Sequence, residues 1–354
     1  MNVENHSYSR NITNKKIAIL GLYPPPFGGV SVHIQRVADQ FLQQDNKVYL
    51  FATEQWLRRI FPLYMIKLVV WILIKRPQYI YYHSSYLNFS IAELVLLSFV
   101  KSLLRSSMTI VDHDCRHLYK RSDRYKRWYN WVLQRKGCAV VCIGSSTWKS
   151  YKDNGIKPPS YAVEQAFLPP VTATIHLILE TYPSSLFTFL RDYTPLMVVS
   201  AAHVMLIDGK DVYGLDVCID MLAGIKARYP DAGLIIGLPQ VRDASYLSSL
   251  QRRMKEKGVA EQIYILYGNK ELWPLLQKVD LFVRPTLSDG DSVSVREALH
   301  FNVPVVASDA VERPEGVHCF KKGNVPEFTM TVEMVLQDCV YGGLEQARRV
   351  TWFK

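Results

Sequence analysis

Long apolar runs, clustered cysteines and the common nucleotide-binding motifs are scarce or missing in this chain of 354 residues. The polar start, MNVENHSYSRNITN, lacks the apolar stretch of a signal peptide, so we expect a cytoplasmic protein. Six dispersed cysteines argue against a zinc site and favour reduced core thiols. No GxGxxG or P-loop motif indicates dinucleotide or ATP binding. With 49% hydrophobic and 21% charged residues, the composition is that of a folded protein.

Positive charge is concentrated in the first half of the chain. The net charge is +10, and residues 1–180 hold 23 Lys and Arg against 11 Asp and Glu, whereas residues 181–354 hold 19 against 21. This asymmetry predicts that the first half faces an anionic partner, which is a membrane surface, a phosphorylated ligand or a nucleic acid.

Two successive α/β patterns indicate two domains. The first begins with a buried strand at 16–22, a turn, a helix at 32–44 and a second strand at 47–53, an order typical of a parallel sheet. The pattern stops at PSSLFTFLRDYTP and then begins again. We therefore expect a polar tail at 1–14, a first domain at 15–182, a linker at 183–195, and a second domain at 196–354 with a terminal helix. Further strands are predicted at 79–84, 108–114, 139–146, 195–202, 232–237, 262–268, 280–286 and 303–309, and a helix at 272–279.

Two segments of the first half combine basic and aromatic residues. Residues 56–76, WLRRIFPLYMIKLVVWILIKR, are interrupted by Pro62 and Lys67 and fall short of the roughly 20 apolar residues that span a bilayer. A membrane-surface helix and a core helix with charged ends remain equal alternatives for them. Residues 116–136 hold eight Lys and Arg against one acid, a pattern of either a solvated face or an anionic lipid surface.

Residues 281–309, LFVRPTLSDGDSVSVREALHFNVPVVASD, are the most informative segment for function. A strand ends at a polar loop and a helix follows, whose first turn of unpaired N–H groups suits a phosphate. Asp289 and Glu297 are eight positions apart and can both accept hydrogen bonds from the hydroxyls of one ligand. On spacing alone, a helix cap at Asp291 or Ser292 followed by an ordinary helical Glu is the better explanation of the segment.

This segment resembles the signature of family-four retaining glycosyltransferases of the GT-B fold. Asp289 matches the first acid of that signature, a Glu in the family, and Glu297 matches the second. Asn302 replaces the Gly of the family before Pro-Val-Val. The resemblance implies an α/β, GT-B architecture, in which two Rossmann-like doubly wound domains face each other across a cleft.

The N-terminal half resembles the same family at two further places. Gly28 and Gly29 match a Gly pair that lies against the donor, and His113 matches a histidine near the donor sugar, with His117 a weaker candidate. The implied catalytic residues are Asp289, His113 and Glu297. The implied donor-binding residues are Gly28, Gly29, Asp289, Gly290, Ser292, Val293, Ser294, Glu297, Lys210, Arg284 and Arg313.

The sequence departs from the family where an Arg and a Lys usually grip the donor diphosphate. Ala202 or His203 stands in the place of the Arg, and Tyr213 precedes the matching Gly. Lys210, Arg284 and Arg313 are the candidates to supply the missing charge, because a guanidinium fork suits phosphate.

The resemblance implies transfer of a sugar from a UDP- or GDP-linked donor to a lipid-linked saccharide acceptor, with retention of configuration and without a metal or other cofactor. It places the protein at the inner face of the plasma membrane, in the assembly of a bacterial O-antigen, capsule or exopolysaccharide. The alternatives are a catalytically weak or inactive GT-B scaffold, a GT-B sugar-nucleotide epimerase, and a nucleic-acid binder. The last is disfavoured because the sequence shows no recognised nucleic-acid module.

Overall fold

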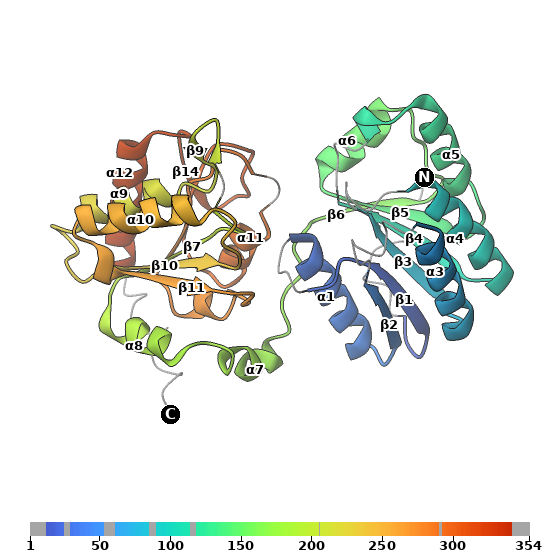
Figure 1. Ribbon diagram of the computed structural model, residues 1–354, viewed down its shortest axis with the longest axis horizontal. Coiled ribbons are helices and arrows are strands. Elements are labelled where there is room, and N and C mark those ends of the chain that lie inside the picture. The colour runs from blue at the N-terminus through green and yellow to red at the C-terminus, as the bar shows by residue number, and fades with distance from the viewer. Residues whose placement is uncertain are drawn as a thin grey trace. The chain divides into compact units, whose positions relative to one another are not determined.

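The chain divides into two compact units, Met1–Leu168 and Pro169–Lys354. A computed structural model describes residues 12–24, 29–52, 61–84, 90–113, 118–204, 206–289 and 292–341. Each unit contains a six-stranded parallel sheet (Figure 1). This confirms the prediction of two Rossmann-like α/β units from alternating strand and helix patterns.

The first sheet has the strand order β2-β1-β3-β4-β5-β6. Ala18 and Leu20 face a core that includes α3, α4, α5 and α6, whereas Ile17 and Ile19 face α1, as the two-residue period of a strand requires. The strands are β1 (Lys16–Gly21), β2 (Lys47–Ala52), β3 (Tyr79–Ser84), β4 (Ser107–Asp112), β5 (Cys138–Ile143) and β6 (Tyr161–Glu164). The helices are α1 (Gly29–Gln43), α3 (Phe61–Lys75), α4 (Ile91–Leu104), α5 (Asp123–Leu133) and α6 (Ser145–Asp153).

The second sheet has the strand order β11-β10-β7-β12-β13-β14. Helices α9, α10 and α12 contribute to the core on one face, and α8 and α11 to the core on the other. The strands are β7 (Leu196–Ser200), β10 (Gly233–Leu238), β11 (Ile263–Tyr267), β12 (Leu281–Arg284), β13 (Val305–Ser308) and β14 (Val317–Phe320), with a hairpin of β8 (Leu206–Ile207) and β9 (Lys210–Asp211). The helices are α7 (Ile175–Leu179), α8 (Ser184–Asp192), α9 (Leu215–Ile225), α10 (Ala244–Glu256), α11 (Val293–His300) and α12 (Val325–Tyr341).

The predicted linker at 183–195 differs from the structure. These residues include α8, whose Leu186 and Phe189 are buried in the core of the second unit. The two side chains are three positions apart and therefore share one helix face. The boundary between the units instead follows Leu168. Residues 272–279 were also predicted as a helix. In the structure only Leu275–Gln277, after Pro274, form a helical turn, and it is of the 3₁₀ type.

Candidate functional site

The order of strands in the second sheet reverses between β7 and β12, which makes this place a topological switch point. From β7 the chain adds β10 and β11 on one side, and then returns to add β12, β13 and β14 on the other. Ligands of open α/β sheets bind outside the carboxyl ends of the strands at such a switch point. Ser200 ends β7 and Arg284 ends β12, so these two residues mark the switch point of this unit.

A nearly buried carboxylate stands between two arginines at this place. Arg284 forms a bidentate pair with Asp289, at 3.0 Å from Nε to Oδ2 and 2.9 Å from Nη2 to Oδ1. Arg313 Nη1 donates to Asp289 Oδ2 at 2.9 Å. The side chains of Arg284, Asp289 and Arg313 are 10%, 8% and 3% exposed. Two guanidinium groups against one carboxylate leave a local net charge of +1.

Burial and ion pairing act in opposite directions on the Asp289 carboxyl. Burial by itself would raise its pKa, but the hydrogen bonds and charges of Arg284 and Arg313 outweigh it and hold the pKa below the ordinary value. Asp289 is therefore an ionised acceptor at neutral pH. An ionised carboxylate has about four lone-pair sites, so it can accept a further hydroxyl beside these partners.

The remaining nitrogens of both arginines bind protein acceptors. Arg284 Nη1 donates to the Ser200 carbonyl oxygen at 2.7 Å. Arg313 Nε donates to the Ser308 carbonyl oxygen at 2.9 Å, and its Nη2 to Thr286 Oγ1 at 3.2 Å. The two arginines therefore position Asp289 and contribute positive charge, and each of their nitrogens already has a protein acceptor.

The start of α11 adjoins this ion cluster through three serines. Ser200 Oγ donates to Ser294 Oγ at 3.2 Å, and the hydroxyls of Ser292 and Ser294 are 3.1 Å apart. Ser292 is the N-cap of α11, but its side chain makes no capping hydrogen bond, and Val293 is the first helical residue. Glu297, one turn further along α11, is 8% exposed.

The start of α9 is arranged differently, because a side chain of the protein already covers it. Asp211 accepts hydrogen bonds from the backbone N–H groups of Tyr213, Gly214 and Leu215, at 2.9, 3.2 and 3.0 Å. The φ of Gly214 is +69°, and a Cβ there would lie 2.5 Å from the Pro285 carbonyl oxygen. Lys210 is exposed on the hairpin that leads to this turn. Sequence reasoning missed Asp211, although an Asp a few residues before a helix is a recognised capping pattern.

The switch point of the first sheet, between β1 and β3, carries three histidines. His33 lies on α1, His83 on β3 and His113 directly after β4. The centroids of the His33 and His83 rings are 5.9 Å apart, those of His33 and His113 are 4.9 Å apart, and those of His83 and His113 are 5.3 Å apart. Within the part of the chain that the structure describes, each ring offers one nitrogen within 4.8 Å of the other two, an arrangement able to hold a metal ion.

Only His113 of these three was predicted as a site residue. His83 is the next-to-last residue of the segment YIYYHS, but nothing local distinguishes it from a structural strand-end histidine. Gly29 begins α1, whereas Gly28, Gly290 and His117 lie outside the described residues. The structure thus brings together Asp289, Arg284, Arg313, Ser292 and Ser294, and it places His113 in the other unit.

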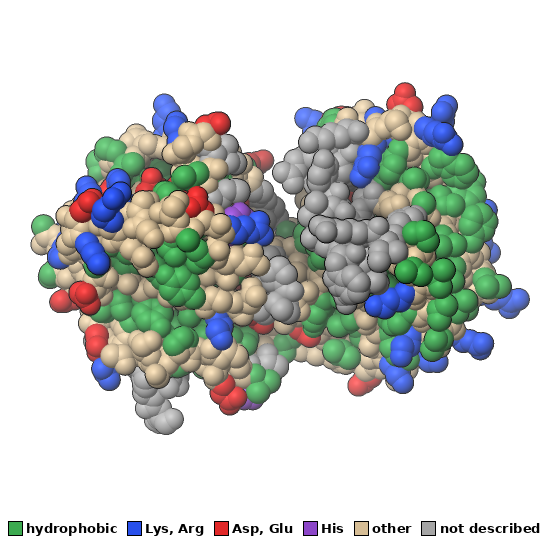
Figure 2. All heavy atoms as spheres, in the orientation of Figure 1, with side chains coloured by type: hydrophobic (Ala, Val, Ile, Leu, Met, Phe, Trp, Pro, Cys, Tyr) green, Lys and Arg blue, Asp and Glu red, His purple; other side chains and the backbone are tan. Residues whose placement is uncertain are grey.

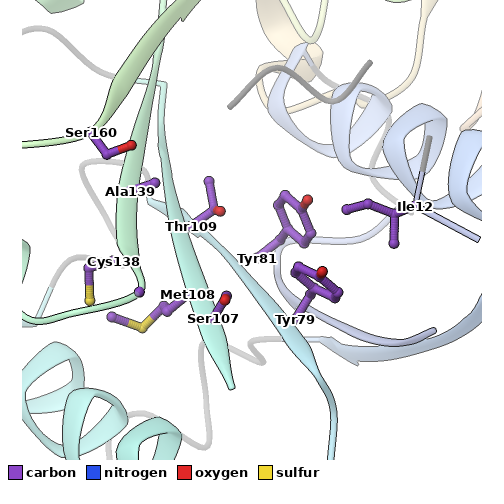
Figure 3. A pocket seen from close by; sticks show the side chains of 10 residues that line it. Ile12, Tyr79, Tyr81, Ser107, Met108, Thr109, Cys138, Ala139 and Ser160 are labelled. Carbon is purple, nitrogen blue, oxygen red and sulfur yellow. The ribbon is translucent and has the colours of Figure 1, made fainter. Parts of the chain in front are cut away.

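A separate cavity of about 210 Å³ lies at the amino-terminal part of the first sheet. Apolar and hydroxyl side chains line it, among them Tyr79, Tyr81, Ser107 and Thr109 (Figure 3). None of the predicted site residues is among its lining residues.

The second unit matches a known protein family over residues 204–338, under the description "Glycosyl transferases group 1". This segment is therefore similar to a group 1 glycosyltransferase domain. The domain includes Lys210, Arg284, Asp289, Glu297 and Arg313, so most of the predicted donor site falls within it.

Two curated relatives match short segments of the chain. An uncharacterized glycosyltransferase of Methanocaldococcus jannaschii, MJ1059, is 28% identical over 95 residues, and the mannosyltransferase LpsB of Rhizobium meliloti, described as a lipopolysaccharide core biosynthesis enzyme, is 29% identical over 97 residues. Each match covers 27% of this chain, and 22% and 28% of the two relatives.

The whole chain is similar in fold to solved glycosyltransferase structures. The Anabaena protein Alr3699/HepE, solved in complex with UDP, covers 91% of this chain and 90% of its own, at a TM-score of 0.60 and 16% identity. The GT-B fold that the sequence resemblance implies is therefore confirmed.

Proposed function

We propose that this protein is a retaining glycosyltransferase, which moves a hexosyl-type sugar from a UDP- or GDP-linked donor to a lipid-linked saccharide. The observation that carries the proposal is the Arg284–Asp289–Arg313 cluster beside the start of α11, because it combines net positive charge with an ionised acceptor at a ligand-binding switch point. HepE was solved in complex with UDP and with UDP-glucose, which supports a nucleotide-sugar donor.

The donor diphosphate binds at the first turn of α11. Its amides around Val293 and the Ser292 and Ser294 hydroxyls supply hydrogen-bond donors, and the positive end of the helix dipole favours the anion. Glu297 accepts hydrogen bonds from the ribose hydroxyls, and Asp289 from a hydroxyl of the sugar. Lys210 supplies the further positive charge that the family Arg and Lys would otherwise provide.

The transfer itself needs no metal. The acceptor oxygen forms a bond to the anomeric carbon while the bond from that carbon to the diphosphate oxygen breaks, and the leaving diphosphate takes both electrons and finally a proton. Preorganised positive groups stabilise the charge that develops on the leaving group. The family resemblance assigns His113 to the surroundings of the donor sugar, and we expect the first unit to bind the acceptor.

An apolar patch on the first unit supports attachment to a membrane surface. Leu63, Ile66, Val70 and Ile74 share one exposed face of α3, because their spacing follows the helical period. Figure 2 shows hydrophobic side chains gathered over this part of the unit, with lysine and arginine side chains around them. The exposed side chains of Phe99 and Leu103 on α4 and Trp128 on α5 extend the same surface, since α4 contacts both α3 and α5.

Helix α3 has one face in the core and one face exposed, and the exposed face supports the membrane-surface alternative. Tyr64, Leu68 and Ile72 of α3 are buried in the core, while the face defined above is exposed. Among the described residues no helix is long and apolar enough to cross a bilayer. We propose that the apolar patch lies on the inner face of the plasma membrane, where lipid-linked acceptors of O-antigen, capsule or exopolysaccharide assembly reside, and that its basic side chains contact anionic lipid.

Sedimentation with lipid vesicles tests this surface. We expect the protein to pellet with vesicles that contain anionic lipid, more weakly with neutral vesicles, and least for the variant Ile66→Ser/Ile74→Ser/Phe99→Ser. The matched control is Met330→Ser/Met334→Ser, which removes exposed apolar side chains from α12 of the second unit. Equal binding by all three proteins would contradict the proposed surface.

Donor binding is tested by thermal shifts with UDP-, GDP- and ADP-sugars, with and without EDTA. A ligand that binds only the folded state stabilises it by about 2.7 kcal/mol at a hundredfold excess over Kd. We expect one nucleotide class to raise the Tm equally with and without EDTA, and Glu297→Ala to abolish most of that rise. Asp289→Asn should lower turnover more than it lowers donor affinity.

A non-catalytic scaffold is the second candidate function. Two observations favour a scaffold. Every guanidinium nitrogen of Arg284 and Arg313 already donates to a protein acceptor, and Asp211 already caps α9. Few groups are then left to bind a diphosphate. A scaffold would bind the donor without hydrolysing or transferring its sugar. A GT-B epimerase would instead change the configuration of the free nucleotide sugar, which NMR of the donor detects.

A further inference from the structure

The three histidines at the switch point of the first sheet form a buried cluster that the proposed transfer does not use as a whole. His33 is 1% exposed and His83 is 2% exposed, while His113 is half-buried. One ring nitrogen from each lies within 4.8 Å of the other two. We propose that His33, His83 and His113 bind a zinc ion, with water as the fourth ligand.

One pair of nitrogens is close to the spacing of a tetrahedral site. Zn–N bonds of about 2.0–2.1 Å place two tetrahedral ligands about 3.3–3.4 Å apart. His83 Nδ1 and His113 Nε2 are 3.0 Å apart, and the His33 nitrogen lies within 4.8 Å of both other ligand atoms. Zinc binding therefore requires this pair to open by a few tenths of an ångström and the His33 ring to move toward it.

A backbone contact sets which nitrogen of His33 carries its proton. Its Nδ1 is 2.8 Å from the Ala166 carbonyl oxygen, and because a carbonyl only accepts, Nδ1 is the N–H donor. The lone pair of neutral His33 is therefore on Nε2. Histidines that bind metals commonly donate their other N–H to a backbone carbonyl or carboxylate in this way.

The hydrogen bond between His83 Nδ1 and His113 Nε2 requires a proton on one of these two nitrogens. Zinc replaces this bond, and the proton moves to the other nitrogen of the same ring. Imidazole nitrogen suits zinc, copper, iron and nickel, and zinc accepts three histidines and a water.

The site joins three segments of the first unit that are distant in sequence. Gly21, at the end of β1, allows α1 and β3 to approach the β1 backbone closely. A Cβ at this position would lie 3.0 Å from His83 Cβ and 2.6 Å from Ile34 Cδ1. A zinc ion here ties α1 to the ends of β3 and β4. It also fixes the orientation of the His113 ring, whose outer edge remains partly exposed. The ion belongs to the first unit, whereas Arg284, Asp289 and Arg313 of the proposed donor site belong to the second.

Metal content of the full chain tests the proposal without reference to activity. The purified protein is stripped with EDTA, checked by circular dichroism for a retained fold, loaded with Zn²⁺ and freed of excess by gel filtration. We expect about one zinc per chain by elemental analysis. Loading with Co²⁺ should produce the visible absorption bands of a four-coordinate nitrogen site.

Conservative variants locate the ion and separate binding from folding. His33→Gln, His83→Gln and His113→Gln should each weaken zinc binding by more than the roughly 10- to 100-fold that loss of an outer-shell partner costs. The matched controls are His318→Gln, an exposed histidine, and Cys319→Ser, an exposed thiol able to bind zinc adventitiously. Both controls should retain one zinc.

Two outcomes would overturn the proposal. One is folded wild-type protein that takes up neither Zn²⁺ nor Co²⁺, which would leave the cluster as a hydrogen-bonded histidine network. The other is unchanged zinc content in all three histidine variants, which would place the ion elsewhere. Because the readout is metal content, failure here is distinguishable from failure of donor binding, which the thermal shifts report.

Discussion

The switch points of the two sheets occupy corresponding places and differ in how they keep polar groups buried. The first holds three imidazoles, whose pKa values burial lowers, so the groups stay neutral. The second holds a carboxylate between two guanidinium groups, and their hydrogen bonds and charges keep Asp289 ionised although its side chain is only 8% exposed. A titratable group that loses water either gives up its charge or acquires a partner of opposite charge.

This difference indicates what each place can bind. Neutral imidazoles offer lone pairs and suit a cation, whereas the Arg284–Asp289–Arg313 cluster has net positive charge and adjoins a helix start that suits an anion. We therefore expect the same sheet architecture to bind ligands of opposite sign in the two units.

Removal of the central carboxylate should have the largest effect on the charged cluster. Asp289→Ala leaves Arg284 and Arg313 buried without their shared partner, and we expect it to lower the free energy of unfolding by about 3–5 kcal/mol. Urea denaturation measures the change. The matched control is Asp192→Ala, which removes an exposed ion pair with Arg191 and should cost less than about 1 kcal/mol. Similar losses in both variants would show that burial does not distinguish the two pairs.

Replacing Asp289 by its neutral isostere Asn should reveal how the carboxylate charge contributes to the free energy of unfolding at different pH values. The folded-state pKa of Asp289 lies below its ordinary value of about 3.9, so its ionised form stabilises the fold above that pH. The stabilisation is lost as the pH falls through the folded pKa. The difference in unfolding free energy between wild type and Asp289→Asn should stay constant from about pH 8 to 5 and shrink below about pH 4. A difference that already shrinks between pH 8 and 6 would contradict the low pKa.

Loss of the Glu297 carboxylate should affect donor binding more than folding. Hydrogen bonds to a charged group contribute about 1.5–3 kcal/mol, so Glu297→Gln should weaken donor binding by roughly 10- to 150-fold in calorimetry. Glu333→Gln, on α12, is the matched control and should leave the affinity unchanged. An unaffected Kd in Glu297→Gln would remove this residue from the donor site.

The smallest expected effect concerns the close packing behind the histidines. Gly21→Ala places a Cβ against Ile34 and His83, and such overpacking typically costs about 1–3 kcal/mol. Because the Ile34 methyl is the end of a flexible side chain, we expect the low end of this range in EDTA. Displacement of His83 should also weaken zinc binding. Equal zinc affinity in wild type and Gly21→Ala would show that this approach does not position the ring.

Local sequence patterns predicted most strands, but two segments differ from their predictions. The buried-strand pattern at 16–22 and the segment 281–309 correspond to β1 and to β12, α11 and β13. The stretch at 183–195 was predicted as a linker because the strand and helix pattern stops there, yet Leu186 and Phe189 form a buried helix face. The stretch at 272–279 was predicted as a helix, but only Leu275–Gln277 form a 3₁₀ turn. For α3, the uniform apolar composition does not show that one face packs in the core and the other is exposed.

The sequence by itself determined the two parallel sheets and the segment that holds Asp289 and Glu297, because strand and helix periods and a loop signature are local properties. Only the tertiary structure decided which side chains meet. Arg313 reaches Asp289 from 24 positions away, and the order β1, β3, β4 brings His33, His83 and His113 together. Whether a group there is charged or neutral depends on burial and on partners from distant segments, which no local pattern records.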